Sequence, residues 1–242
     1  MILNSGFSMK KSIDLPAAIG FFLLSAAILL SVIDTVAFSR SFYRLTYDRL
    51  NTAEDIGMSE EDLYEATDVL LDYLQGKRDD IDFEAEVNGG KQEIFSTKEA
   101  LHMEDVRTLY QNSVKAQYLL YAVSLILILL TAVLERKKTG GNLFDSYRYG
   151  ILLTALCMGF ITLLAAVDFY DFWINFHELF FDNDLFYLDP NTSIMINMFP
   201  QEFFVRMVAC TVIVTVLIYI ILGIVLHAWK KKERENAERC TV

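Results

Sequence analysis

The chain has 242 residues, 54% of them hydrophobic, with a formal net charge of −11 and a mean hydropathy of +0.33. Soluble domains usually contain about 45–50% apolar residues, and here the excess is concentrated in four blocks. This pattern excludes an ordinary soluble enzyme and a disordered chain. The net acidity also argues against a nucleic-acid-binding protein, which needs a basic surface.

The four apolar blocks span residues 16–38, 118–134, 150–167 and 203–229. Each has about the 17–25 residues that a helix needs to cross a hydrocarbon core ~30 Å thick. Buried helices of a soluble bundle would carry polar stripes, which these blocks lack. The first block is longer than the h-region of a cleaved signal peptide, which has about 7–15 residues. We therefore predict four transmembrane helices, the first of them retained.

Basic residues in the flanks of the blocks indicate the orientation of the chain. Lys and Arg precede the first block at Lys10 and Lys11, and they recur in 135–149 and 230–242, whereas 168–204 contains none. By the positive-inside rule, both termini and the 135–149 loop are cytoplasmic. Of the 32 acidic residues, 25 lie in 39–116 and 168–204, so the negative charge belongs to the outer face.

The organisation predicted from these features has eight parts. They are a cytoplasmic tail with the first span at 1–38, an extracytoplasmic α+β domain at 39–116, a second span at 117–134, a cytoplasmic loop at 135–149, a third span at 150–167, an extracytoplasmic aromatic loop at 168–202, a fourth span at 203–229 and a cytoplasmic tail at 230–242.

The outer segment 39–116 is too long for a plain loop and carries local folding signals. Residues 59–62 (SEED) resemble a capping box and begin a helical pattern through Leu74. Residues 81–87 alternate in polarity before the turn Asn88-Gly89-Gly90, which predicts a hairpin. Residues 96–99 (STKE) form a second capping box, which starts a helix towards the second span. The fold class predicted is an all-α membrane protein with a small α+β domain between spans 1 and 2.

Two histidines lie in the predicted outer segments. His102 is followed at i+3 by Asp105, which shares its helix face, and His177 has Trp173 at i−4 and Glu178 beside it. Each could be a structural side chain at the membrane interface. As a pair, the imidazoles could serve as general base and general acid near neutral pH. Because His102 lies roughly 21 Å before the second span on a straight helix, we expect this helix to bend or to lie flat.

A metal site is the alternative use of the same region. His102, Asp105, His177 and Glu178 could supply ligands, but the chain has no His-Glu-x-x-His pattern. Asp34 lies in the outer third of the first span, where a charge needs a partner, and we expect it to pair with Arg206 or Arg40.

Several stretches of the outer segments match a known family in order. They are 43–50 (YRLTYDRL), 57–63 (GMSEEDL), 72–76 (DYLQG), 99–106 (EALHMEDV), 176–181 (FHELFF), 189–190 (DP) and 200–204 (PQEFF). With these motifs the chain resembles the bacterial four-span membrane proteins of the lipoprotein intramolecular transacylase family. The motif around His102 and the motif around His177 are the most specific. Phe186-Tyr187 departs from the family pattern, in which a Trp is expected shortly after the FHELFF-type motif.

The resemblance implies an enzyme that moves the sn-2 acyl chain of an S-diacylglyceryl cysteine to the α-amine of the same cysteine. The product is a lyso-form lipoprotein, and neither a cofactor nor a metal is implied. The expected partners are diacylated lipoproteins in the outer leaflet of the cytoplasmic membrane and the bilayer itself, with no nucleic acid. The family's two histidines map onto His102 and His177 as catalytic residues.

Further roles are expected for residues near the histidines. Asp105 and Glu178 are expected to orient or support the histidines. The candidate substrate-binding residues are Arg44, Tyr47, Trp173 and Glu202. The active site would then face the extracytoplasmic side of the cell membrane.

Three classes of function remain open on sequence grounds. An intramolecular acyltransferase requires both histidines and no metal. A metal-dependent membrane hydrolase would lose activity with chelators, and a non-catalytic membrane binding protein would tolerate replacement of both histidines.

Overall fold

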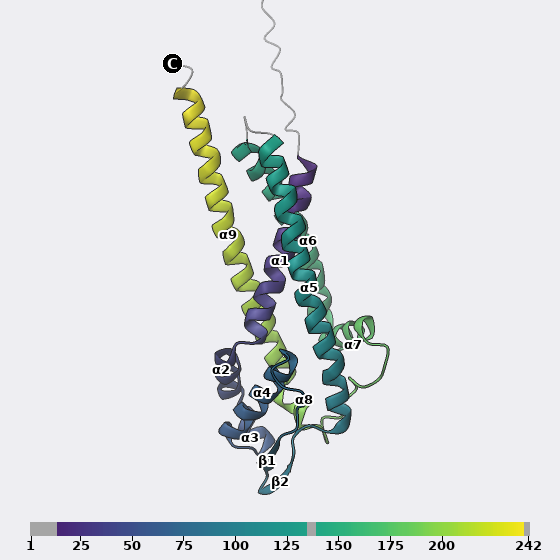
Figure 1. Cartoon of the computed structure of the whole chain (residues 1–242). Helices are drawn as coiled ribbons and strands as arrows, with labels where there is room; N and C mark the ends of the chain where they lie inside the picture. The colour runs from purple at the N-terminus through teal and green to yellow at the C-terminus, as the bar shows by residue number, and fades with distance from the viewer. Residues whose placement is uncertain (1–13, 135–138, 240–242) are drawn as a thin grey trace, which may run out of the picture. The chain divides into compact units, whose positions relative to one another are not determined.

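The computed structural model describes residues 14–134 and 139–239 (Figure 1). In chain order the elements are α1 (Leu15–Ala37), α2 (Arg40–Leu50), α3 (Thr52–Ile56), α4 (Glu60–Leu74), β1 (Glu84–Val87), β2 (Gly90–Glu93), α5 (Thr97–Leu134), α6 (Thr139–Val167), α7 (Phe169–Phe180), α8 (Ile194–Met198) and α9 (Gln201–Arg239). The basic residues Lys10, Lys11 and 136–138, which support the predicted orientation, lie outside the described residues.

Among the described residues, four helices are long and apolar enough to span a membrane, namely α1, α5, α6 and α9. A two-stranded sheet lies between the first and the second of them. These observations confirm the predicted fold class. They follow from composition, because a helix satisfies all of its backbone hydrogen bonds within one segment and can therefore cross lipid.

Helices α5 and α9 are much longer than a hydrocarbon core requires. With 38 and 39 residues they extend about 57 and 58 Å, against a core of about 30 Å. The polar first half of α5 therefore extends beyond the apolar part that begins near Tyr118. The helix is continuous from Thr97 to Leu134. The bend that we expected from the sequence between His102 and the second span therefore does not interrupt the helix.

The chain divides into two compact units. The first contains residues 14–26, 120–134, 139–157 and 218–239 of the described chain. Its helices approach closely at glycine: a Cβ at Gly150 of α6 would lie 2.8 Å from Phe21 Cβ and 3.0 Å from the carbonyl oxygen of Ala18. Hydroxyl groups add contacts between helices, since Tyr219 Oη donates to the carbonyl of Ser25 over 2.7 Å. Small residues and polar bonds are the usual means of helix association in lipid.

Substitution at Gly150 tests this packing. We expect Gly150→Val to lower the apparent unfolding temperature of the detergent-purified protein, because the added atoms would overlap α1. Gly159→Ala on the same helix is the matched control, since no atom lies within 4 Å of a Cβ there and alanine favours helix by about 1 kcal/mol. Equal unfolding temperatures for the two variants would contradict the close approach of α1 and α6.

The second unit contains residues 27–119 and 158–217. Its hairpin pairs Glu84 with Glu93 and Val87 with Gly90, and Asn88 and Gly89 turn with φ of 53° and 79°. This confirms the predicted hairpin, because an Asn-Gly pair accommodates the positive φ angles of a two-residue turn. Helix α4 also begins as predicted, with the Ser59 side chain accepting a hydrogen bond from the backbone N–H of Asp62.

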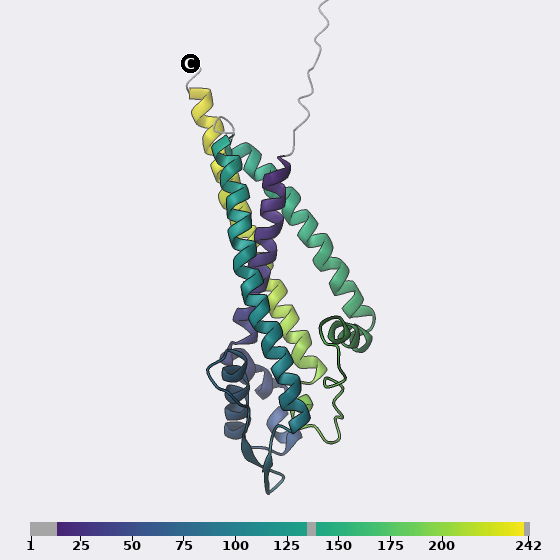
Figure 2. The same ribbon diagram turned by 45° about the vertical axis from the view of Figure 1, so that its right-hand side comes forward.

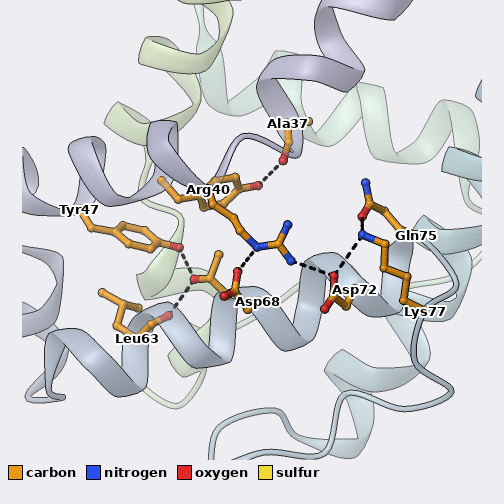
Figure 3. Close-up of polar contacts among 10 residues, drawn as sticks. Ala37, Arg40, Tyr47, Leu63, Asp68, Asp72, Gln75 and Lys77 are labelled. Carbon is orange, nitrogen blue, oxygen red and sulfur yellow. Dashed lines mark hydrogen bonds and ion pairs between the residues drawn. The ribbon is translucent and has the colours of Figure 1, made fainter.

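An ion-pair network joins α2 to α4 in this unit (Figure 3). Arg40 Nε lies 2.6 Å from an Asp68 carboxylate oxygen, and Arg40 Nη2 lies 2.8 Å from one of Asp72. The hydrogen bond from the guanidinium to Asp72 raises the pKa of Arg40, although partial burial acts in the opposite direction. Arg40 therefore does not pair with Asp34 as the sequence suggested; Asp34 instead accepts a hydrogen bond of 2.9 Å from Tyr110 Oη.

Candidate active site

All residues of the candidate active site belong to the second unit. The first turn of α5 is capped as predicted, with the backbone N–H of Ser96 donating to Glu99 Oε2 over 2.6 Å. The Glu99 side chain is only 2% exposed. Its other oxygen, Oε1, accepts a hydrogen bond from the Ser193 hydroxyl at the N-cap of α8. One buried carboxylate thus ties the start of α5 to the connection between α7 and α9.

His102 lies almost one turn after Glu99 on α5 and is 5% exposed. Its Nδ1 atom is buried and has no hydrogen-bond partner among the described residues. Buried polar atoms in proteins are nearly always paired, and exceptions concentrate at functional positions. His102 is therefore placed by the helix cap and retains an unused hydrogen-bonding atom.

His177 lies in the last turn of α7, which crosses the end of α6 (Figure 2). Asp168 caps this helix by accepting a hydrogen bond from the backbone N–H of Asp171. His177 Nδ1 is 2.7 Å from the carbonyl oxygen of Trp173. Because a carbonyl can only accept, Nδ1 carries the proton, and in the neutral ring Nε2 keeps its lone pair. The backbone of α7 therefore selects one tautomer of His177.

The two imidazoles face each other in an aromatic environment. Their ring centroids are 5.8 Å apart with an interplanar angle of 35°, and His177 is 6% exposed. Phe181 lies 5.3 Å from the His102 ring and Phe186 lies 4.9 Å from the His177 ring. Trp173 lies 4.7 Å from His177 on its own helix. Three aromatic rings thus shield the pair from water.

This environment favours the neutral form of both rings. Burial lowers the pKa of His102 to about 4; the neighbouring His177 also lowers it, and Asp105 partly opposes the change. Burial likewise lowers the pKa of His177 from 6.5, partly offset by its bond to the Trp173 carbonyl. Both imidazoles are therefore neutral at pH 7.

The supporting carboxylates predicted from sequence bind other partners. Asp105 accepts a hydrogen bond of 2.9 Å from Asn183 Nδ2, and the described residues contain no hydrogen bond between Asp105 and His102. Glu178 accepts one of 3.2 Å from Tyr187 Oη. Both carboxylates therefore bind the segment that carries Phe186.

The predicted substrate-binding residues fall in three places. Trp173 contacts His177, as described above, whereas Glu202 is exposed in the first turn of α9. The guanidinium carbon of Arg44 lies 5.0 Å from the centre of the Tyr64 ring, which belongs to α4. Tyr47 is 2% exposed and shares a hydrogen bond of 3.0 Å with Thr67, in the region shown in Figure 3. Among these four, the structure brings only Trp173 into contact with the histidine pair.

Comparison with known proteins gives a family match over most of the chain. The model of the family described as lipoprotein intramolecular transacylase Lit matches residues 18–204. This chain belongs to the lipoprotein intramolecular transacylase (Lit) family. It is accordingly a membrane-integral acyltransferase. No match to this chain is found among curated proteins.

Solved structures show the same fold. The chain is similar to the membrane-integral Lit of Bacillus cereus, with 23% identity, a TM-score of 0.71 and coverage of 91% of this chain and 96% of that one. A variant of that protein with a histidine replaced by arginine gives 22% identity, a TM-score of 0.71 and coverage of 92% and 93%. A variant with that histidine replaced by alanine gives 22% identity, a TM-score of 0.65 and coverage of 93% of this chain and 94% of that one.

Some residues around the histidines of this Lit-family chain are not evident as site residues from sequence. Phe181 and Phe186 form the aromatic environment, and Asn183 and Ser193 attach their segment to α5. The sequence identifies Glu99 as part of a capping box, but it does not indicate the hydrogen bond that Glu99 accepts from Ser193. The partner lies 94 positions away, and no local pattern indicates it.

The carboxylates of the alternative metal site are bound to other partners in this Lit-family chain. Within residues 14–134 and 139–239 there is no group of three or more His, Cys, Asp or Glu arranged to hold a metal ion. Asp105 and Glu178 are instead engaged by Asn183 and Tyr187. The donor set proposed from sequence is therefore not assembled.

Acidification tests the burial of the neutral imidazoles. An unfolded His binds a proton near pH 6.5, whereas folded His102 does so only near pH 4. Stability from the neutral ring is therefore present above pH 6.5 and lost as pH falls towards 4. The apparent unfolding temperature of the detergent-purified protein should fall over this interval. His102→Gln should show a smaller fall in unfolding temperature, because it lacks the buried imidazole. The carboxylates that also bind protons at low pH are common to both proteins. Equal pH dependence in the two proteins would contradict the burial of a neutral His102.

Proposed function

We propose that this chain moves the sn-2 acyl chain of an S-diacylglyceryl cysteine to the α-amine of that cysteine, giving a lyso-form lipoprotein. The observation that supports this most directly is the buried pair of neutral imidazoles, 5.8 Å apart. Transfer of an acyl group from oxygen to nitrogen requires proton movement at two atoms. Two imidazoles on different helices provide two such groups without a protein nucleophile.

The reaction is balanced within the substrate. The amine nitrogen forms a bond to the ester carbonyl carbon, and the tetrahedral intermediate then breaks its bond to the glyceryl oxygen. One proton leaves the nitrogen and one joins the glyceryl oxygen, so the mass does not change. Because amine and ester belong to one molecule, correct positioning supplies much of the acceleration.

The hydrogen-bonding states of the two imidazoles favour different roles. With Nδ1–H bonded to the Trp173 carbonyl, His177 presents its Nε2 lone pair as the base that accepts the proton from nitrogen and then returns it to the departing glyceryl oxygen. His102 is neutral and retains an unpaired Nδ1. We assign His102 to hydrogen-bond the oxygen side of the intermediate, where a neutral imidazole acts as a donor without adding a second charge.

The aromatic rings would determine the fate of the intermediate. Phe181, Phe186 and Trp173 surround the imidazoles and leave little room for water. Water at this point would hydrolyse the ester and release a fatty acid. Exclusion of water therefore favours transfer to the amine over hydrolysis.

The same proposal fixes the membrane orientation. We place both termini in the cytoplasm, the domain of residues 39–116 and the loop of residues 168–202 outside, and the substrate in the outer leaflet. The distribution of basic residues supports this orientation. Asp105 and Glu178 then support the site indirectly, through the segment that carries Phe186.

Mass spectrometry of a reporter lipoprotein tests the reaction. The host should make only free-amine, diacylglyceryl lipoproteins and should express either the parent chain or a variant. The parent should yield a peptide of unchanged mass with one acyl chain on nitrogen. His102→Ala and His177→Ala should each reduce this product by a factor of about 100 or more. His227→Ala is the matched control, since His227 on α9 packs against Phe144 on α6, outside the site.

The other outcomes separate the rival functions. A peptide that keeps its free amine and both ester chains despite good expression would refute the acyltransferase proposal. A metal-dependent hydrolase would instead remove one acyl chain from the lipopeptide. A chelator should then abolish this loss, and a divalent metal should restore it.

A further inference from the structure

A cleft of about 500 Å³ lies beside the histidine pair in the second unit. One wall comes from the first turns of α7, the other from the end of α2 and from α3, and the region around α8 and the start of α9 completes it. This volume falls within the range of about 300–1,000 Å³ typical of ligand sites. The proposed chemistry does not use this space.

The cleft and the histidine pair share one face of α7. Phe169, Trp173 and His177 are spaced four residues apart, and their rings contact in sequence at 5.9 and 4.7 Å. Phe169 and Trp173 line the cleft, whereas His177 belongs to the catalytic pair. Eight residues of helix separate Phe169 from His177, a distance of about 12 Å. An extended peptide covers this distance with about four residues.

Most of the surface that lines the cleft is apolar, with a few polar groups among the rings. Besides aromatic and aliphatic side chains it contains Asp55, Asn197 and Gln201. The described lining residues include one carboxylate and neither Lys nor Arg. An acyl chain gains little by leaving the bilayer for such a lining, since its burial is already satisfied in lipid. A peptide brings backbone amides and carbonyls, which match these polar groups.

We propose that this cleft binds the peptide residues that follow the lipidated cysteine of the substrate. The inference rests on the proposed function, because it takes the cysteine to react at His102 and His177. The acyl chains then remain in the bilayer while the peptide runs along α7 towards Asp55. The single carboxylate makes a peptide with a basic residue a better substrate than one with an acidic residue at the same position.

Synthetic substrates of two lengths test this assignment with the full chain in detergent micelles. One is an S-diacylglyceryl cysteine amide, and the other carries four further residues ending in Lys or Glu. The parent should show a lower KM for the longer substrate with Lys. Gln201→Trp, which narrows the cleft, should raise that KM by about tenfold and leave the KM of the cysteine amide unchanged. Gln201→Ala keeps the cleft open and should retain the preference for the longer substrate.

A charge reversal provides a second, independent arm. Asp55→Lys should invert the preference between Lys- and Glu-ending substrates. Glu54→Lys makes the same charge change one residue away, outside the lining, and should leave the preference as in the parent. Because both residues lie on α3, this pair controls for folding and for net charge.

The remaining outcomes overturn the inference. Equal KM values for both substrate lengths in the parent would show that the cleft does not bind peptide. A change in acyl-length preference in Gln201→Trp, without a change in peptide dependence, would assign the cleft to an acyl chain. Failure of the parent to convert any substrate would refute the proposed function itself.

Discussion

Glu99 joins the start of α5 to the start of α8, and the arrangement of the histidine pair depends on that junction. The carboxylate is buried and satisfies both the Ser96 backbone and the Ser193 hydroxyl. Without a partner, a buried charge is costly, so the two bonds are coupled to folding. Asp105 repeats the connection six residues later through Asn183. Helix α5 therefore positions His102 and also holds the aromatic segment that covers it.

Desolvation then determines the chemistry that the site can perform. Rings that exclude water make a charged imidazole unfavourable, and two charged imidazoles in contact would also repel each other. The resting site is therefore neutral and able to accept one proton. Such a site suits the proposed reaction, in which each proton taken from nitrogen is returned to oxygen. That reaction needs no covalent intermediate on the protein, because the proposed substrate carries both the acyl donor and the acceptor.

Local signals in the sequence predict most of the architecture. Apolar runs predict the four long helices, and the Asn88-Gly89 turn predicts the hairpin, because chain length and turn geometry are local properties. Long-range partners are less predictable. Asp34 binds Tyr110 rather than an arginine, and Asp105 binds a distant amide rather than His102. Membrane depth limited the partners expected for Asp34 and helical spacing those expected for Asp105, but tertiary packing determined the actual partner in each case.

The central claim is that both histidines rest neutral, with His177 protonated on Nδ1. Nitrogen-15 chemical shifts of the imidazoles in the full chain, assigned with single His→Gln variants, measure this directly. We predict at pH 7 a protonated Nδ1 and an unprotonated Nε2 for His177, together with a neutral His102 that stays neutral at pH 5. A doubly protonated ring at pH 7, or a His177 that carries its proton on Nε2, would contradict the account.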